Sequence, residues 1–551
     1  MYSRLICRAA LLGLMLAMPA LARAAEEPAA KSDKPSLILR FAALDQLRAD
    51  LGYLAELVGQ KETAKQIDGI FKSKIGEKGL EGIDTKQPIG AYGWVKSSFE
   101  DSPVVVLVPV ADEKAFLGFL ESLDVKTDKG ADGLYTANHE KIPVPIYFRF
   151  ANKYAYITAL HKDILDKDKL LAPAKVLPAG QIGDLSITVN IDQIPDNIKE
   201  LGLGGLDNQL AKTKEKLPQQ GTESEQKFRA AMVDDFGAAV KSLLTNGGET
   251  TLRMDVDRKT TDVTLSLSVA GKPGTPLAMT IKNLGQTKST TASLIGSNSA
   301  MRGALTFNLP PAMRAQLGPM IEEGEKKAID KETDKSKRKA LTALLKALRP
   351  TFKSGELDVA ADLRGPNEKG LYSAVAGIKV KDGTTIDKTF RDIVAGLPAE
   401  ERKAVQFDVE KVGAVGIHRV TPDKNDKNTK ETFGDNPVYF AVREDALLVG
   451  MGDKGLSALK EAVAAEPKAS KVMEFEMALS QFAPLMVKDN KSAPAVAKKV
   501  FADGKDNDKV RISIEGGKVL KLRLSIKGQA VTFFNELQQK KPRPPRDKAG
   551  E

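Results

Sequence analysis

The feature that most constrains the fold of this sequence is a pair of similar segments that lie far apart in the chain. Residues 39–52 read LRFAALDQLRADLG, and residues 305–318 read LTFNLPPAMRAQLG. Six of the fourteen aligned positions are identical without a gap. Apolar alternation that passes into apolar spacing of three and four predicts a β-strand that enters a helix. Both segments therefore predict the same strand-to-helix unit.

A second pair of segments follows in the same order. Residues 145–157, PIYFRFANKYAYI, align with residues 437–449, PVYFAVREDALLV. Each has two period-two apolar runs around a short polar turn, which predicts a β-hairpin. Other pieces also match in order: 104–112 with 374–382, each before an apolar helix, and the closing strand pairs 251–256 and 263–269 with 510–514 and 519–526.

These repeats predict a tandem duplication of one α+β unit. We expect two related halves, each a mainly antiparallel sheet with helices packed on one face. The first half covers residues 36–285 and the second covers residues 300–538. Residues 286–299 are rich in Ser, Thr, Asn and Gly and are predicted to be a linker. A further linker is predicted at 25–35.

Residues 1–24 have the three parts of a secretory signal peptide, namely a basic start, an apolar run and small residues before Ala24. The run is too short to span a bilayer core of roughly 30 Å, and no later segment is apolar enough to do so. We therefore expect cleavage after Ala24, or after Ala22, and a periplasmic or extracellular location. The only cysteine, Cys7, lies in this peptide. The mature chain would then have no disulfide, thiol nucleophile or thiolate metal ligand.

The charge balance is a weak indicator of partners. The formal net charge is +10, and loss of the three arginines Arg4, Arg8 and Arg23 with the signal peptide lowers it to about +7. Over a chain of this length such an excess is typical of a solvated, Lys-rich surface. Residues 539–551 are basic and Pro-rich and are predicted to be a disordered tail. This tail is a candidate contact for an anionic envelope component, and an inert solubilising tail is the alternative.

Two charged segments, 207–245 and 320–349, look like helical insertions. Their apolar residues recur at spacings of three and four and so share one helix face. We expect both stripes to face the core, with a lipid-binding or partner-binding groove as the alternative. These residues are Phe228, Ala231, Met232, Phe236, Ala239, Val240 and Leu243 in the first segment, and Leu341, Leu344, Leu345 and Leu348 in the second.

No catalytic, cofactor-binding or metal-binding residue is predicted. His139, His161 and His418 lack any spacing that would bring two metal ligands together. The serine nucleophile pattern G-x-S-x-G is absent. Two S-x-x-K matches, 457–460 and 336–339, lack the companion elements of that chemistry and fit solvated helix positions.

Other short patterns also predict structure rather than chemistry. The glycines of 202–205 follow a helical segment and predict a helix stop. The acidic stretches 423–428 and 503–508 lack the ligand spacing of a calcium loop and predict polar turns. Aromatic residues form only 5% of the chain, and Trp94, the single tryptophan, falls in the apolar strand 89–95. Platforms for stacking sugars or single-stranded nucleic acid are therefore scarce, and no nucleic-acid partner is expected.

Four short segments predict strand-to-helix joints: 44–47, 191–194, 309–313 and 479–482. Asp45, Asp192 and Ser480 are residue types that cap helix N-termini, and Pro310 or Pro311 suits a first helical turn. If Asp192 caps a helix, replacing it with Ala costs about 1 kcal/mol of stability.

With its signal peptide, duplicated strand-to-helix units and Tyr147/Tyr439 hairpins, the chain resembles uncharacterised exported bacterial proteins with duplicated α+β halves. The resemblance implies an envelope setting and carries no activity. The leading hypothesis is an exported, non-enzymatic binding or structural module of the envelope. The alternative is a periplasmic carrier of a lipid or other amphiphile in a sheet-and-helix cavity. A carboxylate-based hydrolase is a weaker alternative, which requires two carboxylates that converge in a cleft and have raised pKa values.

Overall fold

The computed structural model describes residues 34–539 apart from 64–65, 67–68, 70–79, 99, 141, 297, 423–425 and 503–505. The predicted signal peptide, most of the 25–35 linker and all of the basic tail except Gln539 lie outside the described residues. The chain forms two compact units. The late unit comprises Gly205–Ser242 and Met279–Leu522, and the early unit comprises the described parts of Ala24–Gly204, Leu243–Ala278 and Arg523–Glu551.

The early unit is a mainly antiparallel sheet with short helices. Its elements are β1 (Leu37–Phe41), α2 (Leu44–Leu57), β2 (Ile89–Gly93), β3 (Val104–Pro109), α4 (Glu113–Ser122), β4 (Lys126–Lys129), β5 (Tyr135–His139), β6 (Ile142–Ala151), β7 (Tyr154–Ala159), η2 (Lys162–Leu165), α5 (Pro173–Val176), β8 (Leu185–Asn190), η3 (Ile191–Gln193), β9 (Gly247–Asp257), β10 (Asp262–Gly271) and α17 (Gly528–Gln539). Four elements are divided between the units: α6 (Asp196–Glu215), α7 (Glu223–Asn246), α8 (Pro276–Leu284) and β22 (Leu520–Lys527).

The late unit is also built mainly of antiparallel strands, with longer helices. Its elements are β11 (Lys288–Ser289), η4 (Ala292–Leu294), β12 (Met301–Asn308), α9 (Pro311–Lys331), α10 (Lys335–Ser354), β13 (Glu356–Arg364), β14 (Ser373–Lys379), α11 (Gly383–Ala395), α12 (Ala399–Arg402), β15 (Val405–Val412), β16 (Val415–Val420), α13 (Lys427–Phe433), β17 (Val438–Arg443), β18 (Ala446–Met451), α14 (Gly455–Ala464), β19 (Lys468–Ala469), β20 (Met473–Ala478), α15 (Leu479–Phe482), η5 (Ala483–Lys488), α16 (Ala493–Val500) and β21 (Lys509–Glu515). The α+β class predicted from the sequence is thus confirmed.

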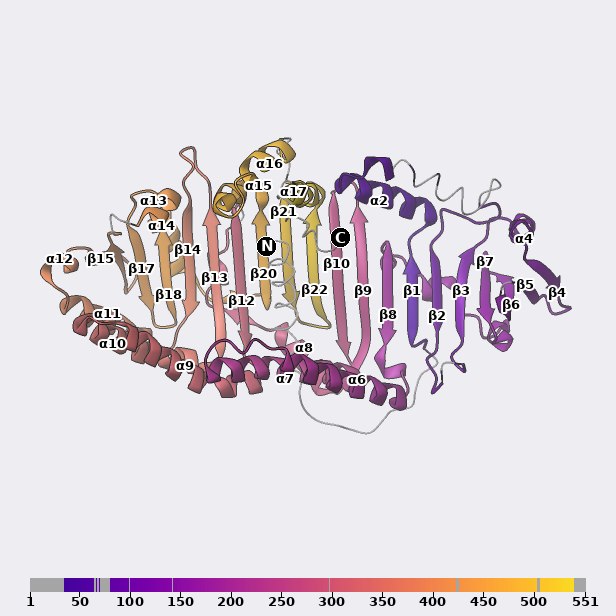
Figure 1. The fold of residues 1–551 in the computed structure, drawn as a ribbon, viewed down its shortest axis with the longest axis horizontal. Coiled ribbons are helices and arrows are strands. Elements are labelled where there is room, and N and C mark those ends of the chain that lie inside the picture. The colour runs from indigo at the N-terminus through magenta and orange to yellow at the C-terminus, as the bar shows by residue number, and fades with distance from the viewer. Residues whose placement is uncertain are drawn as a thin grey trace, which may run out of the picture. The chain divides into compact units, whose positions relative to one another are not determined.

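From β9 in the early unit and β21 in the late unit onward, nine strands follow in corresponding order (Figure 1). In the early unit the order is β10-β9-β8-β1-β2-β3-β7-β6-β5-β4. In the late unit it is β21-β20-β12-β13-β14-β18-β17-β16-β15. The two predicted hairpins share a register, because Tyr147 lies opposite Thr158 and Tyr439 lies opposite Gly450 at the same sequence spacing.

Corresponding helices also begin alike. Asp112 caps α4 by accepting a hydrogen bond from the Ala115 N–H at 2.7 Å, and Asp382 caps α11 by accepting one from the Thr385 N–H at 3.0 Å. Each helix follows the strand that the sequence pattern places before it. These side chains accept N–H groups of the first turn that have no partner within the helix.

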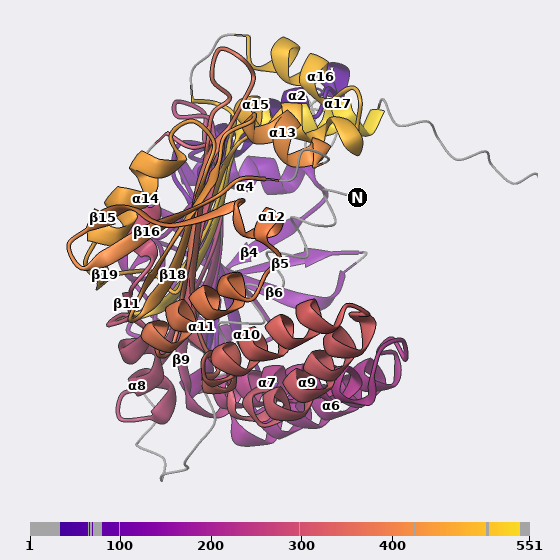
Figure 2. The same cartoon turned by 90° about the vertical axis from the view of Figure 1, so that its left-hand side faces the viewer.

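Helices cover both faces of the late sheet rather than the single face that we expected (Figure 2). Leu448 and Val375 pack with residues of α14 on one face. The adjacent residue Leu447 packs instead with Ile386 of α11 and Ala347 of α10. Because successive strand residues alternate between faces, apolar side chains at both positions need cover on both sides.

Residues 286–299, predicted from the sequence to be a linker, lie against the late sheet and are partly buried at the described positions, which exclude residue 297. We call this segment the strap. Its residues Thr291, Ala292 and Leu294 are less than a tenth exposed, and Leu294 belongs to the same core cluster as Leu448. Gly377 in β14 permits this approach, since a Cβ there would lie 2.8 Å from the Leu294 side chain.

The predicted helix caps at the four joints are mostly wrong. Asp192 lies inside η3 and accepts a hydrogen bond from its neighbour Gln193, without capping a helix. Asp45 accepts the Thr85 hydroxyl, and Ser480 donates to Asp508 instead of capping α15. Only the proline at the first turn of α9, Pro311, is confirmed.

Tertiary partners take over the capping at these joints. The α9 N–H groups of Ala312 and Met313 donate to Asp235 of α7, at 3.2 and 2.8 Å. The N–H of Ser480 likewise donates to Asp508. Such partners lie far away in sequence, which is why a local pattern does not reveal them.

The helical insertions are only partly core-facing. Ala231 and Ala239 of α7 and Ala347 of α10 are buried, whereas the four predicted leucines of α10 are half-buried. The helix stop predicted at 202–205 is wrong, because α6 runs through these glycines. Glycine lowers helix stability by about 1 kcal/mol without ending the helix.

Candidate functional site

The strap is attached to β13 through two buried aspartates that point to the same face of the strand. Asp358 accepts hydrogen bonds from the Ser289 hydroxyl at 2.6 Å, the Thr290 N–H at 2.7 Å and the Thr291 hydroxyl at 2.7 Å. Four residues further on, Asp362 accepts one from the Gly296 N–H at 2.9 Å. These contacts give Asp358 the partners that a buried carboxylate requires, and they engage one oxygen of Asp362.

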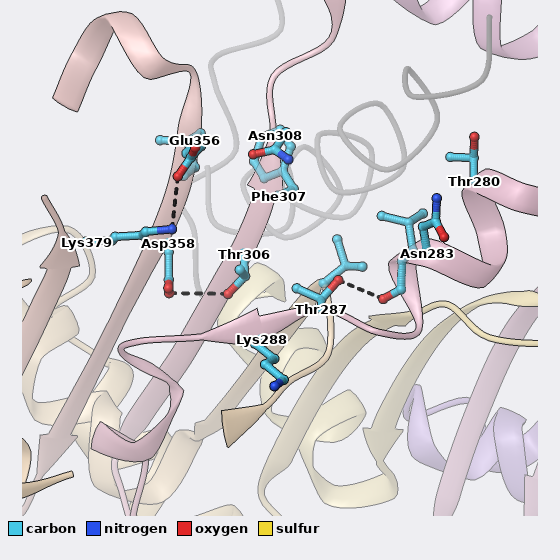
Figure 3. A pocket seen from close by; sticks show the side chains of 13 residues that line it. Thr280, Asn283, Thr287, Lys288, Thr306, Phe307, Asn308, Glu356, Asp358 and Lys379 are labelled. Atoms are coloured by element: carbon cyan, nitrogen blue, oxygen red, sulfur yellow. Dashed lines mark hydrogen bonds and ion pairs between the residues drawn. The ribbon is translucent and has the colours of Figure 1, made fainter. Parts of the chain in front are cut away.

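A cavity of about 520 Å³ lies beside this attachment (Figure 3). We call it the strap cavity. It is bounded by the end of α8, the start of the strap, and strands β12, β13 and β14. Its lining residues are Thr280, Asn283, Leu284, Thr287, Lys288, Thr306, Phe307, Asn308, Glu356, Leu357, Asp358, Lys379 and Val472. Polar side chains outnumber apolar ones in this lining.

Glu356 in the cavity wall forms two ion pairs. Its carboxylate pairs with Lys379 at 2.9 Å and with Lys381 at 3.0 Å. The hydrogen bond from Lys379, followed by that from Lys381, holds the pKa of Glu356 below its usual value. A general acid needs the opposite shift, so Glu356 is placed as an ion-pair partner and not as a proton donor.

Three lining side chains have no hydrogen bond or ion pair with another described residue: Asn283, Lys288 and Asn308. All three are exposed, and they come from α8, β11 and β12 respectively. Figure 3 shows Lys288 on the strap, apart from the ion pair between Glu356 and Lys379. These groups are therefore available to a bound molecule.

A second cavity of about 480 Å³ also borders the ribbon that β11 and β19 form. It shares Leu284 with the strap cavity and is lined by charged residues that include Arg302, Lys468 and Glu474. Lys468 is exposed and provides a lysine of the same ribbon outside the strap cavity.

The residues examined in the sequence for chemistry are not brought together. His139 ends β5, and His161 precedes η2, where its Nε2 lies 2.9 Å from the carbonyl oxygen of Glu100. Ser457 donates to the Lys454 carbonyl, and Lys460 pairs with Glu410 rather than with that serine. Among the described residues, no group of three or more His, Cys, Asp or Glu side chains is placed to hold a metal ion.

His418 on β16 is buried, and both of its ring nitrogens are occupied. Its Nδ1 accepts the Asp408 N–H at 3.1 Å, so its Nε2 carries the proton and donates to Asp387 at 3.0 Å. Burial lowers the pKa of His418. A base needs a free lone pair on one nitrogen, and this ring has none to offer. The group joins α11 to the β15–β16 hairpin.

The early unit contains a buried carboxylate pair, Asp50 and Asp184, each 3% exposed. Asp184 accepts hydrogen bonds from the Gln46 side chain and the Val256 N–H, and Arg258 lies 2.7 Å from Asp50. Burial, followed by the contact with Asp50, raises the pKa of Asp184 to about 6. Neither residue lines the strap cavity or the cavity beside Lys468.

Comparisons with known proteins add little to this geometry. No family model matches the chain, and no curated protein matches it. Two crystal forms of TP0453 show weak structural similarity, with TM-scores of 0.20 and 0.21 and identities of 10% and 11%. The matches cover 46% and 48% of this chain and 79% and 88% of the other. Similarity at this level supports no statement about the function of this chain.

Within the described ranges, every helix is either too short or too polar to cross a bilayer.

The strap residues and Asp358 were missed in the sequence, although one signal was available. Glu356, Asp358 and Asp362 recur at even spacing in a strand-like segment, which places three carboxylates on one face.

Proposed function

We propose that this protein is an exported, non-enzymatic binding module of the bacterial envelope, and that the strap cavity is its binding site. The proposal rests chiefly on the state of the cavity's polar groups. Its carboxylates are held by protein donors, whereas Asn283, Lys288 and Asn308 are exposed and without protein partners. Such an arrangement favours recognition over proton transfer.

The hydrolase alternative has one possible centre, the carboxylate pair Asp50 and Asp184. A raised pKa is what a catalytic acid requires. However, both side chains are almost fully buried, and the partners of Asp184 are the protein's own donors. A substrate would have to displace this packing before reaching either oxygen. The pair is better explained as a structural group at the junction of α2, β8 and β9.

We further propose that the two units arose by duplication. The corresponding strand orders and the shared hairpin register support this origin. On the alignment of Phe41 with Phe307, Arg40 takes the place of Thr306, and Gly90 takes that of Asp358. Arg40 is buried and donates to the Val176 carbonyl at 2.7 Å. The early unit would therefore lack the strap attachment, and the binding site would have developed only in the late unit.

The test is retention of a ligand by the purified chain. Native mass spectrometry after exposure to the small-molecule fraction of a periplasmic extract should show an added mass on the wild type. Asn308→Trp places a large side chain at the exposed rim and should remove that mass. Asn428→Trp, at an exposed position outside the cavity, should keep it. Equal retention by both variants would refute the assignment, and a lipid recovered by solvent extraction would favour the carrier alternative.

A further inference from the structure

The two carboxylates of the strap cavity already have protein donors as partners. Asp358 is 3% exposed and is surrounded by the Ser289 hydroxyl, the Thr290 N–H and the Thr291 hydroxyl. Glu356 receives the ammonium groups of Lys379 and Lys381. A ligand that relied on these acceptors would have to break existing contacts, which is costly for buried groups. The cavity is therefore poor in available acceptors.

The side chains that remain available are mainly donors. Lys288 carries an ammonium group with three N–H donors and no acceptor, and the amides of Asn283 and Asn308 each carry two N–H donors and one acceptor. All three line the cavity from different elements and have no partner among the other described residues. Together they can surround an oxygen-rich group from several sides.

The one unpaired charge in the lining has the same preference. Lys288 and Lys379 line the cavity together with the carboxylates of Glu356 and Asp358. Glu356 is paired with Lys379 and with Lys381, which lies outside the lining, and the hydrogen bond from Lys379 lowers the pKa of Glu356. Lys288 has no carboxylate of a described residue beside it. An unpaired positive charge thus lies on the strap side of the cavity.

The C-terminal end of α8 should repel a bound anion less than a helix end with unpaired carbonyl groups would. Unpaired carbonyl groups at such an end repel negative charge. Here the last four carbonyls of α8 all accept hydrogen bonds. The donors are the Gly517 N–H to Ile281, the Gly285 N–H to Lys282, the Gln286 N–H to Asn283 and the Thr287 hydroxyl to Leu284, at 2.9, 3.0, 3.0 and 2.8 Å.

From this inventory we infer that the strap cavity binds a small, oxygen-rich anion, carrying a carboxylate or a phosphate ester, through Lys288 with Asn283 and Asn308 as flanking donors. The inference rests on the proposed function and adds the class of ligand. A volume of about 520 Å³ suits such a molecule, since small-ligand sites span about 300 to 1,000 Å³. A free metabolite and an anionic lipid headgroup would present the same chemistry.

Calorimetric titration of the purified chain tests the free anions, with citrate and glycerol 3-phosphate as probes. Cosedimentation with phosphatidylglycerol vesicles, against phosphatidylcholine vesicles, tests the headgroup. Lys288→Gln should weaken binding of the preferred probe roughly tenfold or more, because it removes a charge-assisted hydrogen bond. Asn308→Asp should abolish binding by placing a carboxylate at the rim. Lys468→Gln, on the same ribbon but outside the cavity, should bind like wild type.

The outcomes separate the ligand class from the proposed function. Selective loss in Lys288→Gln, with citrate, glycerol 3-phosphate or phosphatidylglycerol, supports the inference and identifies the source. Equal loss in Lys288→Gln and Lys468→Gln indicates general charge attraction and overturns it. N-acetylglucosamine is an uncharged probe. If it binds, and if Asn308→Trp blocks this binding while Lys288→Gln leaves it unchanged, the inferred anionic ligand is wrong but the proposed binding function is retained. Failure of the anions and of the periplasmic extract alike overturns both.

Discussion

The carboxylate of Asp358 on β13 accepts the hydroxyl of Ser289 on the strap at 2.6 Å, and both residues are almost completely buried. The same carboxylate takes the N–H of Thr290 and the hydroxyl of Thr291. One side chain thus satisfies three donors of a segment that has only two residues of β-strand, β11. The strap wall of the cavity depends on this contact.

Asp358→Ala should lower the free energy of unfolding by about 3 kcal/mol, because it leaves the buried hydroxyls of Ser289 and Thr291 and the partly buried N–H of Thr290 without this acceptor. Asp358→Asn should cost less, since one oxygen remains. Urea denaturation measures both changes. Asp435→Ala is the matched control, because Asp435 is exposed and forms only a surface ion pair with Lys430; its cost should stay below about 1 kcal/mol. Similar losses for Asp358→Ala and Asp435→Ala would show that the strap is not attached in this way.

The close approach of the strap to β14 gives a second prediction. A Cβ at Gly377 would lie 2.6 Å from the Leu448 side chain and 2.8 Å from that of Leu294. Gly377→Ala should therefore cost about 1–3 kcal/mol through overpacking. Gly324→Ala in α9 should instead raise stability by up to about 1 kcal/mol, since its Cβ would have no neighbour within 4 Å and the helix gains a better former. Thermal unfolding of the two variants should give shifts of opposite sign.

The elements that the sequence predicted correctly are those specified by local pattern. The alternating runs around Tyr147 and Tyr439 predict hairpins because each strand pairs with its immediate neighbour. The strand-to-helix joint at Phe307 and Pro311 has the same local basis. A proline or an apolar period acts within a few residues, so no distant partner is needed.

The candidate site could not be predicted in this way. Residues 286–299 have the composition of a loop, and what orders them is Asp358, 69 residues from Ser289 in the chain. The caps failed for the same reason, since Asp235 and Asp508 supply the acceptors from elsewhere in the fold. A polar segment can be ordered when a buried carboxylate offers it acceptors, and only the three-dimensional pairing reveals which carboxylate does so.

The carboxylate pair of the early unit predicts a pH dependence. Asp184 has its pKa raised from 3.8 to about 6, chiefly by burial and then by Asp50. The folded state therefore holds this proton more tightly than the unfolded state, and the stability it contributes is lost as pH rises from 4 through 6. Asp184→Asn mimics the protonated form and should raise stability at pH 7 by about 1–3 kcal/mol. It should also flatten the dependence between pH 4 and 7.

Denaturant unfolding at several pH values measures this effect. Asp45→Asn is the control, because Asp45 is exposed on the same helix, α2, and accepts only the Thr85 hydroxyl. Its pH profile should follow that of the wild type. A lower stability of Asp184→Asn at pH 7 would mean that the hydrogen bonds from Gln46 and Val256 outweigh the repulsion between the two carboxylates.

His418 should give a pH dependence of the opposite sign. Burial, opposed by the hydrogen bond to Asp387, lowers its pKa, with Arg391 and Asp408 as the other charged groups beside it. Protonation of Nδ1 would also break the hydrogen bond from the Asp408 N–H. The unfolded state therefore takes up the proton first as pH falls below about 6.5, and stability present at neutral pH is lost toward pH 5. His418→Gln should have a lower free energy of unfolding than the wild type at pH 7.5. Between pH 7.5 and 5 it should lose less stability than the wild type, by on the order of 1 kcal/mol. His161→Gln is the control, because His161 is partly exposed and precedes η2; it should lose as much stability between pH 7.5 and 5 as the wild type. If His418→Gln also lost as much stability over this range as the wild type, another group would be responsible for the pH dependence.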